Sequence, residues 1–498
     1  MRERFYPDFK TFSSLARKGN LVPVYLELLA DLETPVSSFL KICHSQYAYL
    51  LESVEDQEKI GRYSFLSSKP SLVFKSKGRS IEIAEFFGKK IKRTKFSAES
   101  TPLDEVKKIL LKYVPVAVKG LPRFCGGFVG YVSYDMVRFF EKIPDKNKDD
   151  LKLPDCVLML SDTLIIFDHI EHKIKIVANV FLPDKKNRAV IRSAYTKALR
   201  QLSGIKHELN RPLQTPILES VPTAPVKIDS NFSKKAFCGA VKKAKQYIRK
   251  GDIIQTVLSQ RFQVRLKNSP MDIYRRLRSI NPSPYMYFLK LGSLTIAGSS
   301  PEMLIRCEDG RLETRPIAGT RPRGRDEADD ERLAKELLND KKERAEHLML
   351  VDLGRNDVGR VARKGTVEVK RFMAVEKYSH VMHLVSSVQA QLDRRFDAFG
   401  VLSCAFPAGT VSGAPKIRAM EIIDELENVR RGPYAGCVGY FSFSGNMDMC
   451  ITIRTILIKD GICYVQAGAG LVADSVPEKE YKETQNKAKA LIEAITAR

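Results

Sequence analysis

Residues 451–466, ITIRTILIKDGICYVQ, contain two runs of β-branched and aliphatic residues. These runs predict two antiparallel strands, over 451–459 and 462–466. The chain then continues through the capping box Ser475-Val476-Pro477-Glu478 into apolar residues at helical spacing, which predicts a helix up to the end of the sequence. Paired strands followed by a helix, without regular βαβ alternation, favour an α+β fold.

The same mixture extends outward along the chain. Between 227 and 498 we expect helices over 233–250, 271–279 and 329–338, a helix from Asp340 to Gly354, and strands over 253–264, 285–291, 294–298 and 380–392. Apolar runs at 71–74, 156–160 and 163–167 predict strands nearer the start, and 103–113 predicts a helix. We therefore expect large antiparallel sheets flanked by helices.

One segment predicts a boundary between two parts. Residues 211–226, RPLQTPILESVPTAPV, contain four prolines and little periodicity, and proline favours an extended connector because its φ is fixed and it donates no backbone hydrogen bond. We therefore expect an N-terminal region over 1–210, a linker over 211–226 and a C-terminal domain over 227–498.

Composition narrows the class of protein. The 498 residues are 44% hydrophobic and carry a formal net charge of +24, which excludes a mainly disordered chain and raises the question of nucleic acid as a partner. No basic-aromatic motif, helix-turn-helix pattern or zinc module supports nucleic-acid binding.

The sequence contains no apolar run of about 18 residues and no signal-peptide pattern, and its nine cysteines are scattered, so we expect a cytoplasmic protein without membrane contact.

Two pairs of carboxylates have the spacing of a shared helix face. Glu343 and Glu346 are three residues apart, and Glu480 and Glu483 repeat the spacing in the last helix. If the two pairs meet, they form an oxygen-rich site of the kind Mg²⁺ prefers together with water and an anionic substrate. Each pair taken alone is more typical of a solvent-exposed ion-pair face.

Glycine-rich segments offer bare backbone amides to an anion. They lie at 316–322 (PIAGTRP), 406–416 (FPAGTVSGAPK) and 466–470 (QAGAG). Three tight turns are the alternative interpretation. The third glycine of a dinucleotide fingerprint is missing after Gly468-x-Gly470, and the sequence has no P-loop, so nucleotide binding is disfavoured.

An arginine, a glutamate and a pair of histidines are candidates for chemistry. Arg454 in the middle of a strand is costly unless it meets an anion or faces solvent. Glu302 follows an apolar strand, where a carboxyl group can act as a general acid or belong to a simple turn. His380 and His383 are three apart, so in a strand they face opposite sides, and one of them can serve as an acid or base.

Several segments together resemble the chorismate-utilising enzymes, and among these the anthranilate synthase component I branch. They are NPSPYMYF (281–288), SSPEML (299–304), RPIAGTRPR (315–323), KERAEHLMLVDLGRNDVGR (342–360), FPAGTVSGAPKIR (406–418) and GAG (468–470). The resemblance covers 230–490 with specific motifs, and 20–170 more loosely.

The resemblance implies roles for individual residues. Glu346 and Glu483 hold Mg²⁺, with Glu343 and Glu480 in support. Glu302 is the general acid that assists loss of the C4 hydroxyl group, His383 rather than His380 serves the elimination of pyruvate, and Thr410 lies against the substrate. The expected chorismate-binding residues are Gly319, Thr320, Tyr434, Arg454, Gly468, Ala469 and Gly470.

Two positions discriminate between reactions within the family. Relatives that add water resemble this chain but carry lysine where Gln255 stands, and aminodeoxychorismate synthases often carry lysine where Ala318 stands. The sequence has neither lysine, which favours direct attack of ammonia at C2 and formation of anthranilate and pyruvate. Aminodeoxychorismate synthase remains the alternative, since some of its members also have alanine there.

The resemblance also implies a partner and an inhibitor. The chain lacks the G-x-C-x-G segment of a glutamine amidotransferase, so we expect a separate glutaminase subunit and a hetero-oligomer. Ser53, Pro284, Tyr285 and Met286 match the signatures of a tryptophan feedback site.

Overall fold

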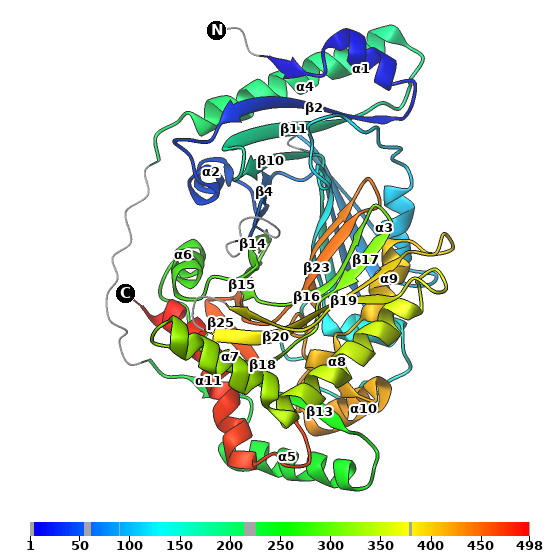
Figure 1. Cartoon of the computed structure of the whole chain (residues 1–498). Coiled ribbons are helices and arrows are strands. Elements are labelled where there is room, and N and C mark those ends of the chain that lie inside the picture. Colours follow the sequence, from blue (N-terminus) through cyan, green and yellow to red (C-terminus); the bar gives the residue numbers. More distant parts are fainter. Residues whose placement is uncertain (1–3, 54–60, 89, 214–225, 378–380, 498) are drawn as a thin grey trace.

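The computed structural model describes residues 4–53, 61–88, 90–213, 226–377 and 381–497. Within these ranges the protein is α+β, with two large antiparallel sheets packed face to face and helices on their outer surfaces (Figure 1). This confirms the predicted fold class. Most of the expected linker, and His380, lie outside the described residues.

The first sheet has 13 strands in the described part of the chain. Its strands, in spatial order, are β1 (Phe5–Tyr6), β2 (Leu21–Leu29), β11 (Lys173–Phe181), β10 (Thr163–Asp168), β4 (Tyr63–Ser68), β3 (Tyr47–Glu52), β14 (Tyr285–Leu291), β15 (Leu294–Ser300), β24 (Thr455–Lys459), β25 (Ile462–Leu471), β13 (Gln255–Arg265) and β12 (Asp229–Ser230), with β21 (Gly413–Ala414) paired to β13.

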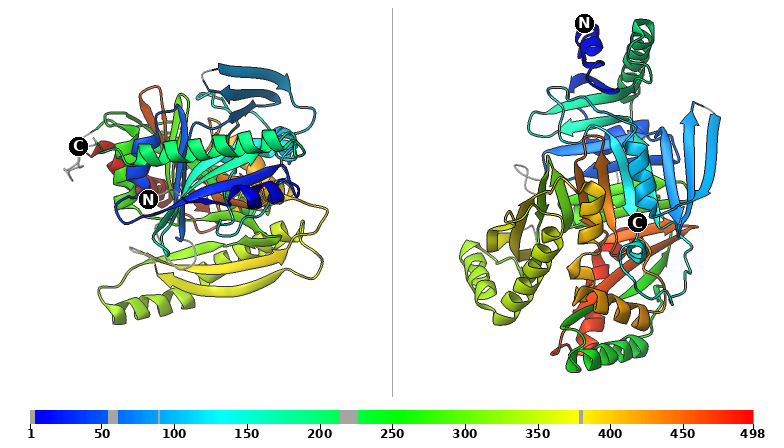
Figure 2. Two further views of the ribbon diagram at one scale, coloured as in Figure 1. Left: turned by 90° about the horizontal axis from the view of Figure 1, so that it is seen from above. Right: turned by 90° about the vertical axis from the view of Figure 1, so that its right-hand side faces the viewer.

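The second sheet has 12 strands within the same ranges. In order these are β18 (Ile317–Pro322), β20 (Val381–Gln391), β17 (Arg311–Thr314), β16 (Met303–Glu308), β23 (Met447–Ile451), β22 (Cys437–Ser442), β8 (Gly127–Val132), β9 (Cys156–Ser161), β5 (Leu72–Lys77), β6 (Ser80–Phe87) and β7 (Lys90–Ser97), with β19 (Glu368–Lys377) paired to β20. Strands β19 and β20 lie with a helix at one side of the molecule (yellow-green in Figure 2).

The helices cover the outer faces of the sheets. They are α1 (Phe9–Leu15), α2 (Pro35–Ile42), α3 (Pro102–Leu110), α4 (Arg188–Leu209), α5 (Lys234–Arg249), α6 (Pro270–Ile280), α7 (Glu327–Asn339), α8 (Lys341–Gly359), α9 (Ala398–Ala405), α10 (Lys416–Leu426) and α11 (Pro477–Thr496), with 3₁₀ turns η1 (Tyr134–Phe139) and η2 (Gly409–Val411). None of the helices in the described ranges is long and apolar enough to cross a membrane.

Successive side chains along a strand point to opposite faces of the sheet, so each sheet contributes apolar side chains to the separate cores on its two faces. Tyr131 of the second sheet and Tyr287 of the first belong to one cluster, which fills the space between the sheets. A second cluster lies under α1, α2, α4 and α6, and a third packs α3, α8 and α9 against the second sheet. The two sheets are therefore held as a rigid frame from both sides.

Each sheet joins a block of strands from the first part of the chain to a block of strands from the second part. Strand β3 pairs with β14, where Glu52 lies opposite Met286, and β8 pairs with β22. The division into 1–210, 211–226 and 227–498 stays a prediction, but neither sheet is built by one part alone.

Three local expectations were wrong. Gly354 does not end its helix, because α8 continues to Gly359 and Gly354 is buried against Thr314 and Pro316. Ser475 does not cap α11: Val476 occupies that position, and Ser475 Oγ accepts a hydrogen bond from the Val472 amide. The expected strand 451–459 is interrupted, since β23 ends at Ile451 and β24 begins at Thr455.

Candidate active site

A cavity of about 500 Å³ gathers most of the predicted site residues. Its walls come from β13, β18, β20, β25, α8, α11, η2 and the connections around 302, 434 and 454. The predicted residues that line it are Glu302, Gly319, Thr320, Glu343, Glu346, His383, Thr410, Tyr434, Arg454, Gly468, Gly470, Glu480 and Glu483. Ala469 does not line it, because its side chain packs into the core beneath α5 and α10.

Three glycines keep the cavity open to a ligand. A Cβ atom on Gly468 would lie 2.6 Å from the Tyr434 hydroxyl, and one on Gly470 would lie 2.8 Å from the Gln255 amide nitrogen. Gly319 has φ +70°, a conformation that side-chain-bearing residues rarely adopt. All three glycines line the cavity, and an added side chain at any of them would collide with a neighbour or strain the backbone.

The four glutamates converge on the cavity from two helices. Burial, followed by the charge of Glu343, raises the pKa of Glu346, and burial also raises the pKa of Glu480. Among the described residues no three acidic, histidine or cysteine side chains are close enough to enclose a metal ion, and Glu483 forms an ion pair with Lys487 at 2.7 Å. The donor chemistry still fits Mg²⁺, which needs only one or two carboxylates beside water and substrate.

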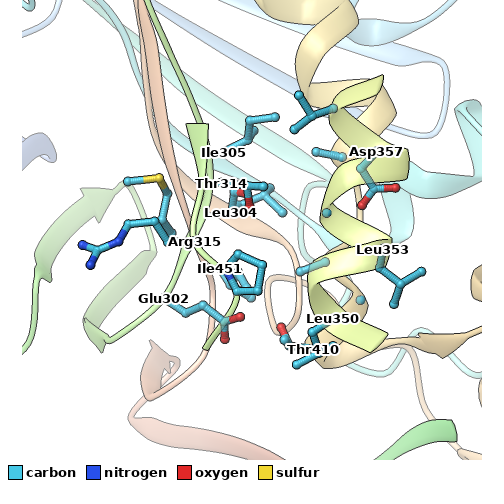
Figure 3. Close-up of a pocket in the computed structure, with 17 residues that line it drawn as sticks. Glu302, Leu304, Ile305, Thr314, Arg315, Leu350, Leu353, Asp357, Thr410 and Ile451 are labelled. Carbon is cyan, nitrogen blue, oxygen red and sulfur yellow. The ribbon is translucent and has the colours of Figure 1, made fainter. Parts of the chain in front are cut away.

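Glu302 lies at the inner end of the cavity, after β15. It is buried, and this burial raises its pKa to about 8, against the opposing effects of Thr410 and Lys487. A second, smaller cavity of about 40 Å³ adjoins it, where Glu302 and Thr410 lie at one end and Asp357 of α8 at the other (Figure 3). Glu302 is therefore protonated at neutral pH and able to donate a proton.

The ring of His383 is fixed by β18. Its Nδ1 lies 3.0 Å from the Gly319 carbonyl oxygen and 3.0 Å from the Thr320 hydroxyl. Because a carbonyl oxygen only accepts, Nδ1 carries the hydrogen and Nε2 is the basic nitrogen. Burial lowers the pKa of His383, so the ring is neutral at pH 7.

Arg454 lies in the link between β23 and β24 rather than in a strand. It has φ +51°, and its Nη1 donates to the Lys487 carbonyl oxygen at 3.0 Å. Burial lowers the pKa of Arg454. A partly buried guanidinium in a cavity wall is an anion-binding group, and Arg454 lines the cavity.

Sequence reasoning missed four lining residues: Lys342, Gln466, Ser475 and Lys487. Lys487 follows Glu483 by four residues on α11, and its Nζ donates to the Gly468 carbonyl oxygen at 3.0 Å. Helical spacing from Glu483 could have found Lys487, because residues four apart share a face.

A third cavity lies where β3 meets β14. It has a volume of about 60 Å³, and Ser53, Pro284, Tyr285 and Met286 all line it. The Tyr285 hydroxyl donates to Asp448 at 3.0 Å. The four residues that the resemblance assigns to a feedback site therefore lie together around one small cavity.

Comparison with known proteins identifies the family. The model of the chorismate binding enzymes matches residues 47–493, which include every wall of the large cavity. The chain belongs to the chorismate binding enzymes.

Within the chorismate binding enzymes, the chain is similar to anthranilate synthase component 1 of Acetivibrio thermocellus (50% identity, covering 99% of this chain and 98% of that one) and of Aquifex aeolicus (51%, 97% and 96%). The crystal structure of anthranilate synthase component I from Streptococcus pneumoniae superposes with a TM-score of 0.76 at 35% identity, covering 93% and 98% of the two chains. The menaquinone-specific isochorismate synthase MenF of Escherichia coli shares the fold, with a TM-score of 0.70 at 18% identity.

Proposed function

We propose that the protein is the component I of an anthranilate synthase, which converts chorismate and ammonia to anthranilate, pyruvate and water. The observation that carries this proposal is the large cavity, where a protonated Glu302, a neutral His383 and the partly buried Arg454 surround one space. The wall contains Gln255 and Ala318 where water-adding and covalently acting relatives carry lysine.

The first half-reaction replaces a hydroxyl group by an amine. Ammonia forms a bond to C2, the two ring double bonds shift, and the C4–O bond breaks as Glu302 gives its proton to the departing oxygen, which leaves as water. The attached ammonium group then loses one proton, which balances the proton given by Glu302. The raised pKa of Glu302 keeps that proton available at neutral pH. Arg454 and the glycine amides bind the carboxylates of chorismate during this step.

The second half-reaction makes the ring aromatic. His383 removes the hydrogen at C2 as a proton through Nε2, the bond between the ring carbon and the enolpyruvyl oxygen breaks, and the released enolate takes up a proton at carbon to become pyruvate. The Gly319 carbonyl oxygen holds the ring of His383 in the required tautomer.

The carboxylates of α8 and α11 would hold Mg²⁺, with Glu346 and Glu483 as ligands and Glu343 and Glu480 supporting them. The ion would supply positive charge opposite the ring carboxylate of chorismate. Its binding would also relieve the repulsion that Glu343 adds at Glu346.

A partner and an inhibitor complete the proposal. A separate glutamine amidotransferase subunit would deliver ammonia in a cytoplasmic hetero-oligomer, in keeping with relatives named component 1. Tryptophan would bind at the junction of β3 and β14, so that 1–210 carries regulation, 211–226 connects, and 227–498 carries catalysis.

The decisive experiment combines the purified chain with chorismate, Mg²⁺ and ammonium, and identifies the aromatic product by chromatography and mass. Anthranilate with an equal amount of pyruvate is expected. Accumulation of aminodeoxychorismate would identify the chain as an aminodeoxychorismate synthase component instead. Formation of isochorismate or salicylate would show that water can act as the nucleophile although Gln255 replaces lysine.

A further inference from the structure

A buried ion pair lies behind the wall of the active-site cavity. Glu427 and Arg431 are 3% and 2% exposed, and they meet in a bidentate contact, with Nε to Oε2 at 2.9 Å and Nη2 to Oε1 at 2.6 Å. A buried ion pair contributes little net stability, because desolvation of the two charges offsets their attraction. Stability alone therefore gives a poor account of this pair, and its remaining contacts indicate another role.

Arg431 ties two segments of the cavity wall together. Its Nη1 donates to the carbonyl oxygen of Val411 in η2, and its Nη2 donates to that of Val257 in β13, both at 2.7 Å. Both of these residues line the cavity, and Val411 follows Thr410 directly. The spacing between η2 and β13 thus depends on the planar fork of one guanidinium group.

The same guanidinium stacks on an aromatic wall residue. It lies 5.6 Å from the ring centre of Tyr434 and 4.8 Å from that of Tyr134. A desolvated arginine over a tyrosine ring is favourable, so Arg431 also fixes the position of Tyr434 relative to η2.

Glu427 extends the network to β25. One of its carboxylate oxygens accepts from both the amide and the hydroxyl of Ser259 at 2.8 Å, and the Ser259 hydroxyl accepts from the Gln466 amide at 2.8 Å. Gln466 lines the cavity. The ion pair therefore contacts or supports four wall segments: η2, β13, β25 and the Tyr434 connection.

We propose that Glu427 and Arg431 are positioning residues that set the separation of these walls around chorismate. The inference rests on the proposed function, since it assigns the walls to chorismate. Neither side chain lines the cavity, so both act through Val257, Val411, Tyr434 and Gln466.

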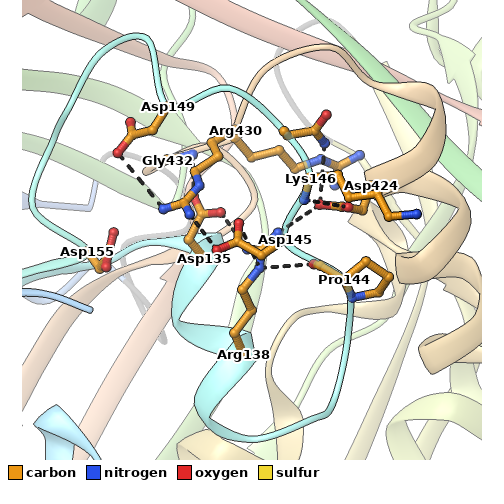
Figure 4. Close-up of polar contacts among 12 residues, drawn as sticks. Asp135, Arg138, Pro144, Asp145, Lys146, Asp149, Asp155, Asp424, Arg430 and Gly432 are labelled. Carbon is orange, nitrogen blue, oxygen red and sulfur yellow. Dashed lines mark hydrogen bonds and ion pairs between the residues drawn. The ribbon is translucent and has the colours of Figure 1, made fainter. Parts of the chain in front are cut away.

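A neighbouring arginine provides a matched control. Arg138 of η1 donates to Asp135 at 2.6 Å and to Asp424 at 2.8 Å, in a polar network that also includes Asp145 and Arg430 (Figure 4). Its side chain is 16% exposed and touches no cavity-lining residue through these bonds. Loss of Arg138 removes buried ion pairs of similar kind without releasing the cavity wall.

The test compares Arg431→Lys, Glu427→Gln and Arg138→Lys with the wild type. Lysine keeps the positive charge of Arg431 but cannot reproduce four donors in one plane. We expect Arg431→Lys to lower kcat/KM for chorismate by about tenfold to a hundredfold, as sub-ångström misplacement in a site does, and to weaken chorismate binding measured by calorimetry. The Arg138→Lys variant should lose melting temperature but keep both kinetic constants.

Two measurements keep the outcomes distinct. Activity is normalised to the amount of folded protein, so that a folding defect is not mistaken for a catalytic one. Chorismate consumption is measured beside product formation. If the wild type consumes chorismate but forms a different product, the proposed function is rejected while the inference on Glu427 and Arg431 can still be tested. The inference is overturned if Arg431→Lys and Glu427→Gln retain wild-type kcat, KM and chorismate affinity, or if Arg138→Lys loses them equally.

Discussion

Replacing Glu302 by glutamine should lower activity but raise the free energy of unfolding, and this gain in stability should grow with pH. The carboxyl group has an ordinary pKa of 4.5 and a pKa of about 8 in the folded chain, because burial disfavours its charged form. The folded state therefore binds one more proton than the unfolded state between these values. Wild-type stability must fall as pH rises from about 4.5 to about 8, and stay level above it.

The size of the effect follows from the same shift. At 1.36 kcal/mol per pH unit, the wild-type penalty is about 3 kcal/mol at pH 7 and about 5 kcal/mol above pH 8. Glutamine has no charge to desolvate. The free energy of unfolding of Glu302→Gln, relative to that of the wild type, should therefore grow by roughly 4 kcal/mol between pH 5 and pH 8.5. The same variant should lose about 10²- to 10⁴-fold in kcat, the usual contribution of a general acid.

Denaturant unfolding at pH 5, 7 and 8.5 measures the stability difference. Anthranilate formation, at a constant concentration of uncharged ammonia, gives the pH profile, in which wild-type activity should decline above pH 8. Glu308→Gln, outside the cavity, serves as the control and should follow the wild type in both assays. A stability difference for Glu302→Gln that is the same at all three pH values would refute the reasoning.

Three further changes test other parts of the site. Glu346→Gln should reduce activity by orders of magnitude with unchanged helical circular dichroism, and wild-type-like activity across a Mg²⁺ titration would contradict the metal assignment. His383→Ala should accumulate a species that carries both the amine and the enolpyruvyl group, detected by mass spectrometry, whereas His380→Ala should not; equal loss of both half-reactions would assign His383 to binding. Ser53→Phe should fill the cavity between β3 and β14 and weaken inhibition by tryptophan, while turnover without tryptophan stays near normal. Since the chain contains no tryptophan, the indole fluorescence of the added ligand reports binding directly, and no binding to the wild type would reject the regulatory site.

Residue spacing along the chain was enough to predict helices whose positions depend on their own sequence. The apolar stripe of α11 and the three-residue spacing of the glutamates need only helical geometry, so they could be inferred before any contact was known. Gly354 shows the limit of this reasoning. Its missing side chain lets α8 approach Thr314 and Pro316, and such packing between distant segments overrides the usual preference of glycine for helix ends.

The site itself required knowledge of which segments meet. Nothing local to Arg454 indicates that its backbone turns into the left-handed region or that Lys487 supplies the acceptor for its guanidinium. The order of strands within the two sheets is equally hidden, because pairings such as β3 with β14 join residues more than two hundred positions apart. These features arise from tertiary contacts, which spacing along the chain does not encode.

The pairing of β3 with β14 also constrains how the chain is made. During synthesis on a ribosome, the strands before residue 182 emerge long before β14, β22, β24 and β25, so neither sheet can close until nearly the whole polypeptide is available. Until then the edges of β3 and β8 offer unpaired backbone groups to other nascent chains. We therefore expect slow folding with a need for chaperones, and we expect fragments cut near 211–226 to be recovered only when both halves are produced together.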